Sequence, residues 1–362
     1  MIEILKKLVT FKTLSTNTEV NNKAIHWLKK EADKYQLYSK ILVYKGSPSL
    51  IITTQKTKKP KLFLAAHLDV VPGADNLFKA RISNNKIYGR GVFDMKYAVA
   101  SYWQLIKDLS SDLDKYNFGI MITTDEEIGG FNGTAKILDT GYCADLCFLP
   151  DSSSNWVFEN QAKGVWHVLV EAVGKSAHGS CPWHGQNAVE NLINFLSSLQ
   201  DHFDYKKYKK QGYNCQTLNI GKFEGGRATN VVADYAKAYL DFRFTPKQSL
   251  KDIQNLINQV AKKFKNIKYS SIVSAESYYF PQQSQYFKLY QSIAYKMYKK
   301  KIKFRMSHGS SDARFFGYKN IQTIVISPNG GGHHSDKEWL DLADWQKFYQ
   351  VLKEFVLKVC KN

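Results

Sequence analysis

The sequence contains 362 residues, of which 44% are hydrophobic, 23% are charged and 14% are aromatic. This composition excludes a wholly disordered chain, a collagen-like fibre and a small disulfide-rich scaffold, and it supplies enough apolar side chains for a sizeable core. No run of about 18 uncharged apolar residues occurs, so the sequence predicts no membrane span. A chain of this length is expected to form two domains.

The net charge of +19 at pH 7 raises the question of nucleic-acid binding, because clustered cations bind phosphates. Only six of the 51 basic residues are arginine, whose forked guanidinium is the usual reader of bases and phosphates. The lysines are spread thinly along the chain. We therefore predict no nucleic-acid partner, and we treat each arginine as a candidate for a site where charge alone does not suffice.

The five cysteines are an odd number and form no C-x-x-C pair, which indicates a reduced protein without a disulfide framework. The first residues, Met1 to Lys12, mix charged with apolar side chains and lack the apolar block and the cleavage site of a secretory signal. We expect a cytoplasmic protein.

The first 160 residues alternate between helical and strand patterns. Apolar side chains recur at helical spacing over 18–35, which predicts an opening helix. The strands that follow are expected at 49–54, 61–66, 118–124 and 145–149, and further helices at 95–109 and 132–138. Strands that alternate with helices predict an α/β sheet.

A different order of elements follows residue 160. The pattern predicts strand, helix, two strands, helix and strand, at 164–173, 188–200, 215–223, 233–244, 249–264 and 267–273. This β-α-β-β-α-β order is the ferredoxin-like arrangement. The α/β pattern then resumes with a helix at 286–298, a strand at 323–326 and a helix at 345–358. We therefore predict an α/β domain of residues 1–160 and 277–362, interrupted by a smaller α+β domain of residues 161–276.

Acids and imidazoles follow the predicted strands in five places. His67 and Asp69 come directly after the strand at 61–66, where open α/β sheets place their sites. Asp94 begins a predicted helix, where capping alone would also explain a carboxylate. The other three places are Asp125-Glu126-Glu127, Pro150-Asp151 and Gly332-His333-His334-Ser335-Asp336.

These residue types together predict a metal centre. Three adjacent carboxylates are costly without a counter-cation, because like charges repel. Carboxylate oxygens combined with imidazole nitrogens suit zinc, cobalt or manganese, and no thiolate is needed. The spacing alone does not choose between His333 and His334 as a ligand.

The motifs, taken in order, resemble the aminoacylase/carboxypeptidase-G/acetylornithine deacetylase/succinyl-diaminopimelate desuccinylase family of dinuclear zinc metallopeptidases and deacylases. The matching segments are His67 to Pro72, Gly89 to Lys96, Thr123 to Gly130, Pro150-Asp151 and the late histidine, with Gly174 to Ser180, Gly185 to Ala188, Asn230 to Val232 and Asp241 to Arg243. The resemblance covers nearly the whole chain. It departs from the family at Tyr97, where a glycine is usual, and in the short stretch 72–88, which lacks the usual tryptophan.

The resemblance implies a zinc-exopeptidase-like catalytic domain that holds two zinc ions, with cobalt or manganese as possible substitutes. It implies that Asp94 bridges the two ions, that His67 and Asp151 complete one site, and that Glu127 and His334 complete the other. His334 is favoured over His333 because the family usually places an acid four or five residues after this ligand, and Glu338 fits that spacing.

The same resemblance leaves Glu126 free to act as the general base. Adjacent residues on an extended chain point in opposite directions, so Glu126 and Glu127 can divide the roles of base and ligand. Asp69 is expected to accept a hydrogen bond from the far nitrogen of His67 and so to fix its tautomer.

The inserted domain resembles the family's dimerisation domain, which implies a homodimer. By this resemblance His178 reaches into the partner's site and stabilises the oxyanion, and Arg243 binds the substrate carboxylate. Asn230 is expected to make another polar contact to the substrate. Ser310 follows a glycine turn and is either a substrate contact or a structural turn residue.

The leading hypothesis is an N-acyl amino acid deacylase of the acetylornithine deacetylase/desuccinylase type, acting on a small carboxylate-bearing substrate. A di- or tripeptidase on the same scaffold is the alternative. A catalytically inactive binding protein is a hypothesis of another class, but every candidate ligand and the candidate base are present. A nucleic-acid binder is the third hypothesis.

Overall fold

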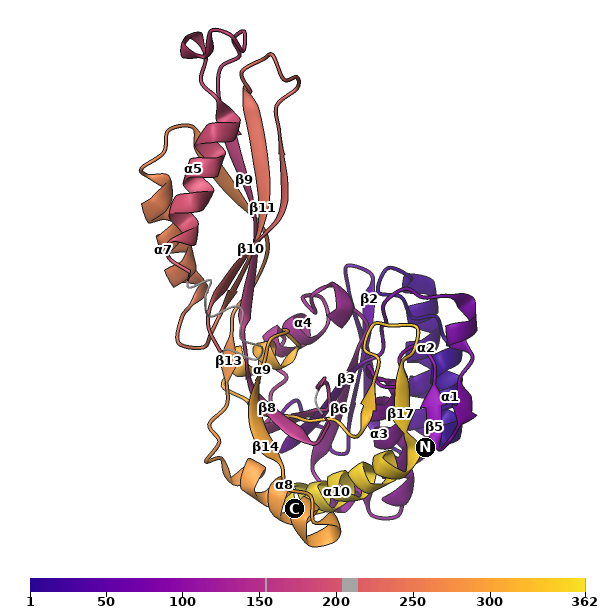
Figure 1. Cartoon of the computed structure of the whole chain (residues 1–362). Helices are drawn as coiled ribbons and strands as arrows, with labels where there is room; N and C mark the ends of the chain where they lie inside the picture. Colours follow the sequence, from indigo (N-terminus) through magenta and orange to yellow (C-terminus); the bar gives the residue numbers. More distant parts are fainter. Residues whose placement is uncertain (154, 204–213, 362) are drawn as a thin grey trace. The chain divides into compact units, whose positions relative to one another are not determined.

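The computed structural model describes residues 1–153, 155–203 and 214–361. The chain divides into two compact units (Figure 1). Unit 1 contains Met1–Asn160, Phe280–Arg305 and Ser311–Asn362, and unit 2 contains Gln161–Tyr279 with Met306–Ser310. The return to unit 1 therefore comes after residue 279, against 276 in the prediction, and the short segment 306–310 joins unit 2.

Unit 1 is built on a six-stranded mixed sheet. Its strand order is β1 (Tyr38–Tyr44), β2 (Ser47–Thr53), β6 (Phe118–Thr123), β3 (Leu62–His67), β7 (Leu146–Leu149) and β15 (Gln322–Val325). Strands β6, β3, β7 and β15 run parallel to one another. At one edge of the sheet, β2 runs antiparallel to β6, and β1 runs antiparallel to β2. Every residue of β3, β6 and β7 is buried, as expected for parallel strands covered on both faces.

The helices of unit 1 cover this sheet. They are α1 (Ile2–Thr10), α2 (Thr18–Ala32), α3 (Lys96–Asp108), α4 (Thr134–Asp139), α8 (Gln285–Tyr298), α9 (Ala313–Tyr318) and α10 (Leu342–Cys360). Helix α2 packs on β1 and β2, whereas α3 and α10 pack on β3. Helix α1 is tied to α3 because the buried amine of Lys96 donates hydrogen bonds to the carbonyls of Leu8 and Phe11.

Two smaller sheets complete unit 1 and its junction with unit 2. One has the order β16 (Gly330–Gly331), β17 (Trp339–Asp341), β5 (Lys86–Tyr88) and β4 (Arg81–Ser83). The other has the order β13 (Tyr278–Tyr279), β8 (Val157–Ala162) and β14 (Lys303–Ser307), and it contains the segments in which the chain passes from one unit to the other. The first small sheet carries the loop with His333 and His334.

Unit 2 is an antiparallel four-stranded sheet with two long helices on one face (Figure 1). Its elements are β9 (Gly164–Val173), α5 (Ala188–Gln200), β10 (Thr217–Gly225), β11 (Tyr235–Phe244), α7 (Leu250–Ala261) and β12 (Ile267–Ala275). The strand order β10-β11-β9-β12 is that of the predicted ferredoxin-like arrangement. Alternate residues of β9 join the core below α5, where Trp166, Val168 and Phe195 are buried.

No helix among the described residues is long and apolar enough to cross a membrane. All five cysteines are free thiols.

Candidate metal centre

The predicted acids and imidazoles of unit 1 gather at one edge of the large sheet. His67 is the last residue of β3, Glu126 and Glu127 follow β6, and Asp151 follows β7. Because these three strands are parallel, their carboxyl ends share an edge, which is where open α/β sheets place their sites. Asp94 joins them from the loop before α3.

Asp94 lies at the centre of the cluster. Its Oδ1 lies 3.1 Å from Nε2 of His67, and its Oδ2 lies 3.1 Å from Nε2 of His334 and 3.3 Å from Nε2 of His333. Nε2 of His334 is also 3.2 Å from Oε2 of Glu127. Asp94 therefore has three imidazoles within hydrogen-bond distance, and Glu127 contacts one of them, His334.

Two groups of possible metal ligands share Asp94. In one group the ligand atoms of Asp94, His67 and Glu127 all lie within 4.8 Å of one another, and in the other the same holds for Asp94, Asp151 and His333. A residue shared by both groups suits the bridging role expected of Asp94. The groups divide the other residues differently from the expected partition, so the assignment of ligands to each ion stays a prediction.

The donor set fits zinc. Zinc–nitrogen and zinc–oxygen bonds of about 2.0–2.2 Å at tetrahedral angles place two ligand atoms of one ion about 3.3 Å apart. The separations between Asp94 and His67, His333 and His334 are 3.1–3.3 Å. The side chains therefore need little movement to hold an ion.

The electrostatics of the cluster also favour a cation. Burial, together with the neighbouring acids Asp94 and Glu127, raises the pKa of Asp151 to about 7, although His67 acts in the opposite direction. Burial likewise raises the pKa of Glu126 well above its usual value. Hydrogen bonds with Asp94 and Glu127 raise the pKa of His334 to about 10. Without a metal, protons would have to balance this buried negative charge.

Asp69 acts differently from the prediction. Nδ1 of His67 is 3.0 Å from the backbone carbonyl oxygen of Asp69, whereas the Asp69 carboxylate is 3.5 Å away. The carboxylate instead accepts hydrogen bonds from the backbone N–H groups of Glu126 and Glu127, at 3.2 and 3.0 Å, and from the hydroxyl of Ser15. Asp69 therefore fixes the tautomer of His67 through its backbone and holds the Glu126–Glu127 turn with its side chain.

Glu126 and Glu127 do not lie on an extended chain, so this part of the sequence argument is wrong. They begin a short 3₁₀ turn, Glu126–Ile128, because Gly129 N–H binds the Glu126 carbonyl and Asp69 holds the first two N–H groups. With about three residues per turn, successive side chains point roughly 120° apart. Because their side chains point in different directions on this turn, the two carboxylates can still serve separate roles.

Glu338 stands out in the sequence only by its spacing from His334, but in the structure its carboxylate supports the whole Asp94 loop. It accepts hydrogen bonds from the backbone N–H groups of Gly91, Phe93 and Asp94 at 2.8–3.0 Å. It also pairs with the buried guanidinium of Arg90 at 3.1 Å. An arginine in a lysine-rich chain is the sequence signal that could have pointed here.

Tyr97, the departure from the family pattern, is a second supporting residue that the sequence did not assign. Its buried hydroxyl donates a hydrogen bond of 2.6 Å to the carbonyl of Pro150, directly before Asp151. Its ring stacks on that of Phe93, directly before Asp94, with the centroids 6.2 Å apart. Tyr97 therefore connects the backbones that carry two of the predicted ligands.

The remaining predicted residues belong to unit 2. His178 pairs with Val231 in an isolated bridge, and Asn230 accepts a hydrogen bond from the adjacent Gly179 N–H, so His178 and Asn230 lie together. Arg243 lies near the far end of β11, where it pairs with Asp241 at 2.8 Å. Ser310 ends the segment 306–310. The structure therefore brings His178 and Asn230 together but not Arg243.

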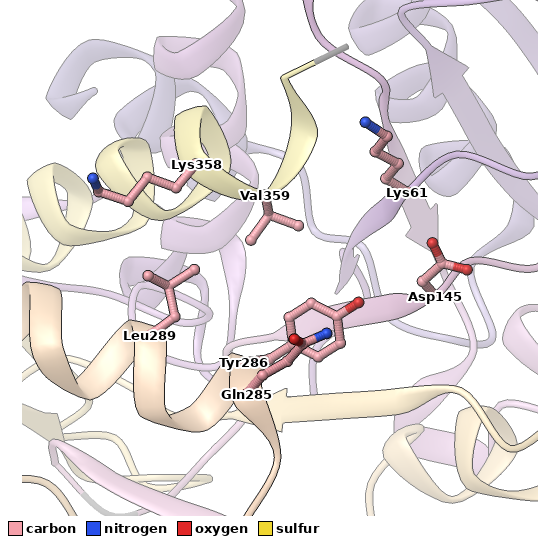
Figure 2. A pocket seen from close by; sticks show the side chains of 7 residues that line it. All are labelled: Lys61, Asp145, Gln285, Tyr286, Leu289, Lys358 and Val359. Carbon is pink, nitrogen blue, oxygen red and sulfur yellow. The ribbon is translucent and has the colours of Figure 1, made fainter.

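One well-formed pocket of unit 1 is separate from this cluster (Figure 2). It has a volume of about 430 Å³ and is lined by Lys61, Asp145, Gln285, Tyr286, Leu289, Lys358 and Val359. Lys61 and Asp145 directly precede β3 and β7, whereas His67 and Asp151 lie at the other ends of these strands. The pocket therefore lies at the amino ends of β3 and β7, away from the metal centre at their carboxyl ends, and is not part of that centre.

Comparison with known proteins gives a consistent family match. The model of peptidase family M20/M25/M40 matches residues 63–358. The succinyl-diaminopimelate desuccinylase of Rickettsia canadensis is 28% identical, over 100% of this chain and 99% of its own length. A tripeptidase structure from Staphylococcus aureus superposes with a TM-score of 0.79 at 20% identity, over 99% of this chain and 97% of that one.

A third similar structure is a Bacillus subtilis protein described as a dinuclear metal-binding peptidase from the M20 family. It superposes with a TM-score of 0.68 at 14% identity, and the match covers 99% of this chain and 97% of the other. These matches confirm the predicted α/β fold with its inserted α+β domain.

Proposed function

Because the chain belongs to peptidase family M20/M25/M40, we propose that this hydrolase uses two zinc ions to remove an acyl group from an N-acyl amino acid, in the manner of a desuccinylase. One observation carries the proposal: the Asp94 carboxylate has three imidazole nitrogens within 3.3 Å, and the half-buried acid Glu126 lies on the turn that also carries Glu127.

Five residues are proposed to hold the metals. Asp94 bridges the ions, His67 and Asp151 complete one site, and Glu127 and His334 complete the other. His334 is preferred to His333 for the second site because it alone of the two has a close contact with Glu127. The Bacillus subtilis relative described as dinuclear supports two ions. Bound zinc would polarise the scissile carbonyl and acidify a water molecule.

Glu126 is proposed to carry the protons. It takes a proton from the attacking water as oxygen adds to the amide carbon, and it delivers that proton to the amine nitrogen as the carbon–nitrogen bond breaks. Burial raises its pKa well above the usual value, which favours the protonated form that delivers the proton. Asp69 holds the Glu126 backbone N–H and thereby fixes the position of the base.

A desuccinylase activity is favoured because two relatives that align over nearly the whole chain are named succinyl-diaminopimelate desuccinylase. The Rickettsia protein aligns over the complete chain, and so does a Pelagibacter ubique protein of the same name, at 25% identity over 98% of this chain. The Staphylococcus tripeptidase supports the alternative of a di- or tripeptidase, because it shares the whole fold. Both reactions cleave an amide next to a carboxylate, so Arg243 is proposed to bind that carboxylate in either case.

We further propose a cytoplasmic homodimer in which unit 2 supplies the contacts and His178 and Asn230 complete the partner's site. The loop of His178 supports this role: its imidazole is exposed and is held by the Ser180 hydroxyl at 2.7 Å. An exposed, oriented imidazole is free to act as a donor to an oxyanion. Ser310 is proposed as a further substrate contact.

The test is a hydrolysis screen of the zinc-loaded protein against N-succinyl and N-acetyl amino acids, dipeptides and tripeptides, with the Glu126→Gln protein as control. We expect the highest kcat/KM for an N-succinyl substrate and a kcat roughly 10² to 10⁴ lower for the control. Faster cleavage of tripeptides would replace the deacylase by the peptidase. Equal, slow turnover by both proteins would contradict the proposed site.

A further inference from the structure

Two adjacent histidines enter the metal centre, and the proposed set of five ligands uses only one. Nε2 of His333 lies 3.3 Å from Oδ2 of Asp94, nearly as close as Nε2 of His334. The two differ in their second neighbour. His334 lies beside Glu127, whereas His333 lies in the same group as Asp151.

The separation between His333 and Asp94 is that expected for two ligands of one metal ion. Two ligand atoms on one tetrahedral zinc ion are separated by about 3.3 Å. A hydrogen bond would explain the contact with Asp94 equally well, so that distance alone does not decide. The second observation is that an Asp151 oxygen, an Asp94 oxygen and a His333 nitrogen all lie within 4.8 Å of one another. A hydrogen bond to Asp94 does not require a second carboxylate beside the imidazole.

The imidazole of His333 is held in place by its surroundings. The Phe93 ring meets it edge to face, with the ring centroids 5.2 Å apart. On the same loop, Gly330 packs so closely on Phe93 that a Cβ added there would lie 2.2 Å from the ring. Glycine at this position therefore lets the His333 loop approach the backbone of Asp94.

Tyr97 extends the same support to Asp151. Its ring stacks on Phe93, and its hydroxyl binds the Pro150 carbonyl. Phe93 and Tyr97 therefore connect His333, Asp94 and Asp151 as one packed group. This is the kind of support that orients the ligands of a metal site.

We propose that His333 is a sixth protein ligand of the dinuclear centre, on the side of Asp151, while His334 serves the side of Glu127. The proposal rests on the proposed two-metal function and adds a ligand to it. The ion on the side of Asp151 should then bind more tightly than in a dinuclear centre with only one histidine in this loop.

The experiment measures metal binding without substrate. Metal-free wild-type, His333→Ala, His333→Gln and His334→Ala proteins are titrated with Zn²⁺ against a chromophoric chelator. The His26→Ala protein is the matched control, because His26 is exposed on α2, where its Nδ1 is hydrogen-bonded to the Asn22 carbonyl of the same helix. Circular dichroism of each protein verifies the fold.

We expect His333→Ala and His333→Gln to bind two ions, one of them at least about tenfold more weakly than in wild type. In the Co²⁺-loaded protein, the visible absorption of one ion should change when His333 is replaced, because its coordination changes. His334→Ala should weaken binding of the other ion, so the losses should add in a protein that carries both His333→Ala and His334→Ala. The control should match wild type.

Wild-type zinc affinities and an unchanged Co²⁺ spectrum in both His333 variants would overturn the proposal, even if KM rose. Loss of the same ion in His333→Ala and His334→Ala would also overturn it. These outcomes are distinct from a failure of the proposed function. That failure would appear as no zinc binding by the wild-type protein, or as binding of two ions without hydrolysis of any substrate class.

Discussion

The side chain of Glu338 accepts a hydrogen bond from the backbone N–H of Asp94 at 3.0 Å, across 244 residues of sequence. The same carboxylate binds the N–H groups of Gly91 and Phe93 and pairs with Arg90, and both charged side chains are only 2% exposed. An acid from the loop just before β17 therefore helps to determine where the central carboxylate of the metal centre lies.

Replacing Glu338 should damage both stability and metal binding. Glu338→Gln leaves the buried Arg90 without its closest counter-charge, because the other acid beside it, Asp336, is 3.7 Å away and exposed. Breaking a buried ion pair costs about 3–5 kcal/mol of unfolding free energy. Zinc affinity should fall by roughly 10–100-fold, because the support of Asp94 is weakened. Urea unfolding and zinc titration measure the two effects.

The control for this prediction is Glu354→Gln on α10, which removes an exposed pair with Lys358. Surface pairs contribute little, so this variant should stay within about 0.5 kcal/mol of wild type. Equal stability of the two variants would show that Glu338 does not support the loop.

Replacing Glu126 and Glu127 one at a time should separate the role of the general base from that of the metal ligand. Glu126→Gln should keep both zinc ions and lose roughly 10² to 10⁴ in kcat, the usual contribution of general acid–base catalysis. Glu127→Gln should instead lose zinc, because Glu127 lies 3.2 Å from His334 at the centre. Metal analysis and steady-state kinetics of each protein provide the readouts. The division of roles is wrong if both variants lose the same amount of zinc.

The sequence predicted those parts of the fold that are determined by residues close together along the chain. Strands β3, β6 and β7 are continuous apolar runs because both faces are buried, and the acids that follow them were found by this pattern. Strand β1 was missed because its residues are mostly exposed or half-buried, so its apolar pattern is weak. Helix α1 was missed as well, although its apolar face is buried.

The contacts that position the site could not be read from the sequence because they join distant segments. Glu338 reaches Asp94, and Tyr97 reaches Pro150, only after the chain has folded. The choice between His333 and His334 depends on where each imidazole points, which spacing does not encode. The 3₁₀ turn at Glu126 depends on the Asp69 carboxylate, 57 residues away.

Tyr97 should stabilise unit 1 through both its hydroxyl and its ring. Tyr97→Phe removes a buried hydrogen bond, but Ser327 still donates to the Pro150 carbonyl at 3.2 Å, so we expect a loss of about 1 kcal/mol. Tyr97→Gly, which restores the usual family residue, should cost roughly 3–5 kcal/mol because it leaves a cavity. Urea unfolding measures both losses. Tyr38→Phe, at an exposed tyrosine, is the control and should change nothing.

Removing the metals should make stability depend on pH. The pKa of Asp151 is about 7 in the metal-free fold against 3.8 for a free side chain, and that of His334 is about 10 against 6.5. Both groups then bind more protons folded than unfolded, so stability should rise as the pH falls from about 9 to about 6. The stabilisation from His334 is complete below pH 6.5 and is lost as the pH rises through 10.

Thermal unfolding of chelator-treated protein between pH 6 and 9 tests this expectation. In the zinc-loaded protein the trend should weaken or reverse, because metal competes with protons for the same atoms. The metal-free double variant Asp151→Asn with His334→Asn should show a flatter profile than metal-free wild type. A metal-free wild-type protein that is more stable at pH 9 than at pH 6 would contradict the sign of the prediction.

The last prediction concerns the proposed role of His178 across a dimer. His178→Ala alone should keep its zinc and lose about 10² to 10³ in kcat, the usual effect of removing one oxyanion donor. Mixing this protein with Glu126→Gln and allowing subunits to exchange creates mixed dimers. In these, the chain with intact Glu126 receives His178 from its partner, so one complete site forms per mixed dimer. With random exchange, activity should recover to about a quarter of wild type, because half the dimers are mixed and half their sites are complete. If exchange is verified by mass spectrometry and no activity returns, His178 acts within its own chain or not at all.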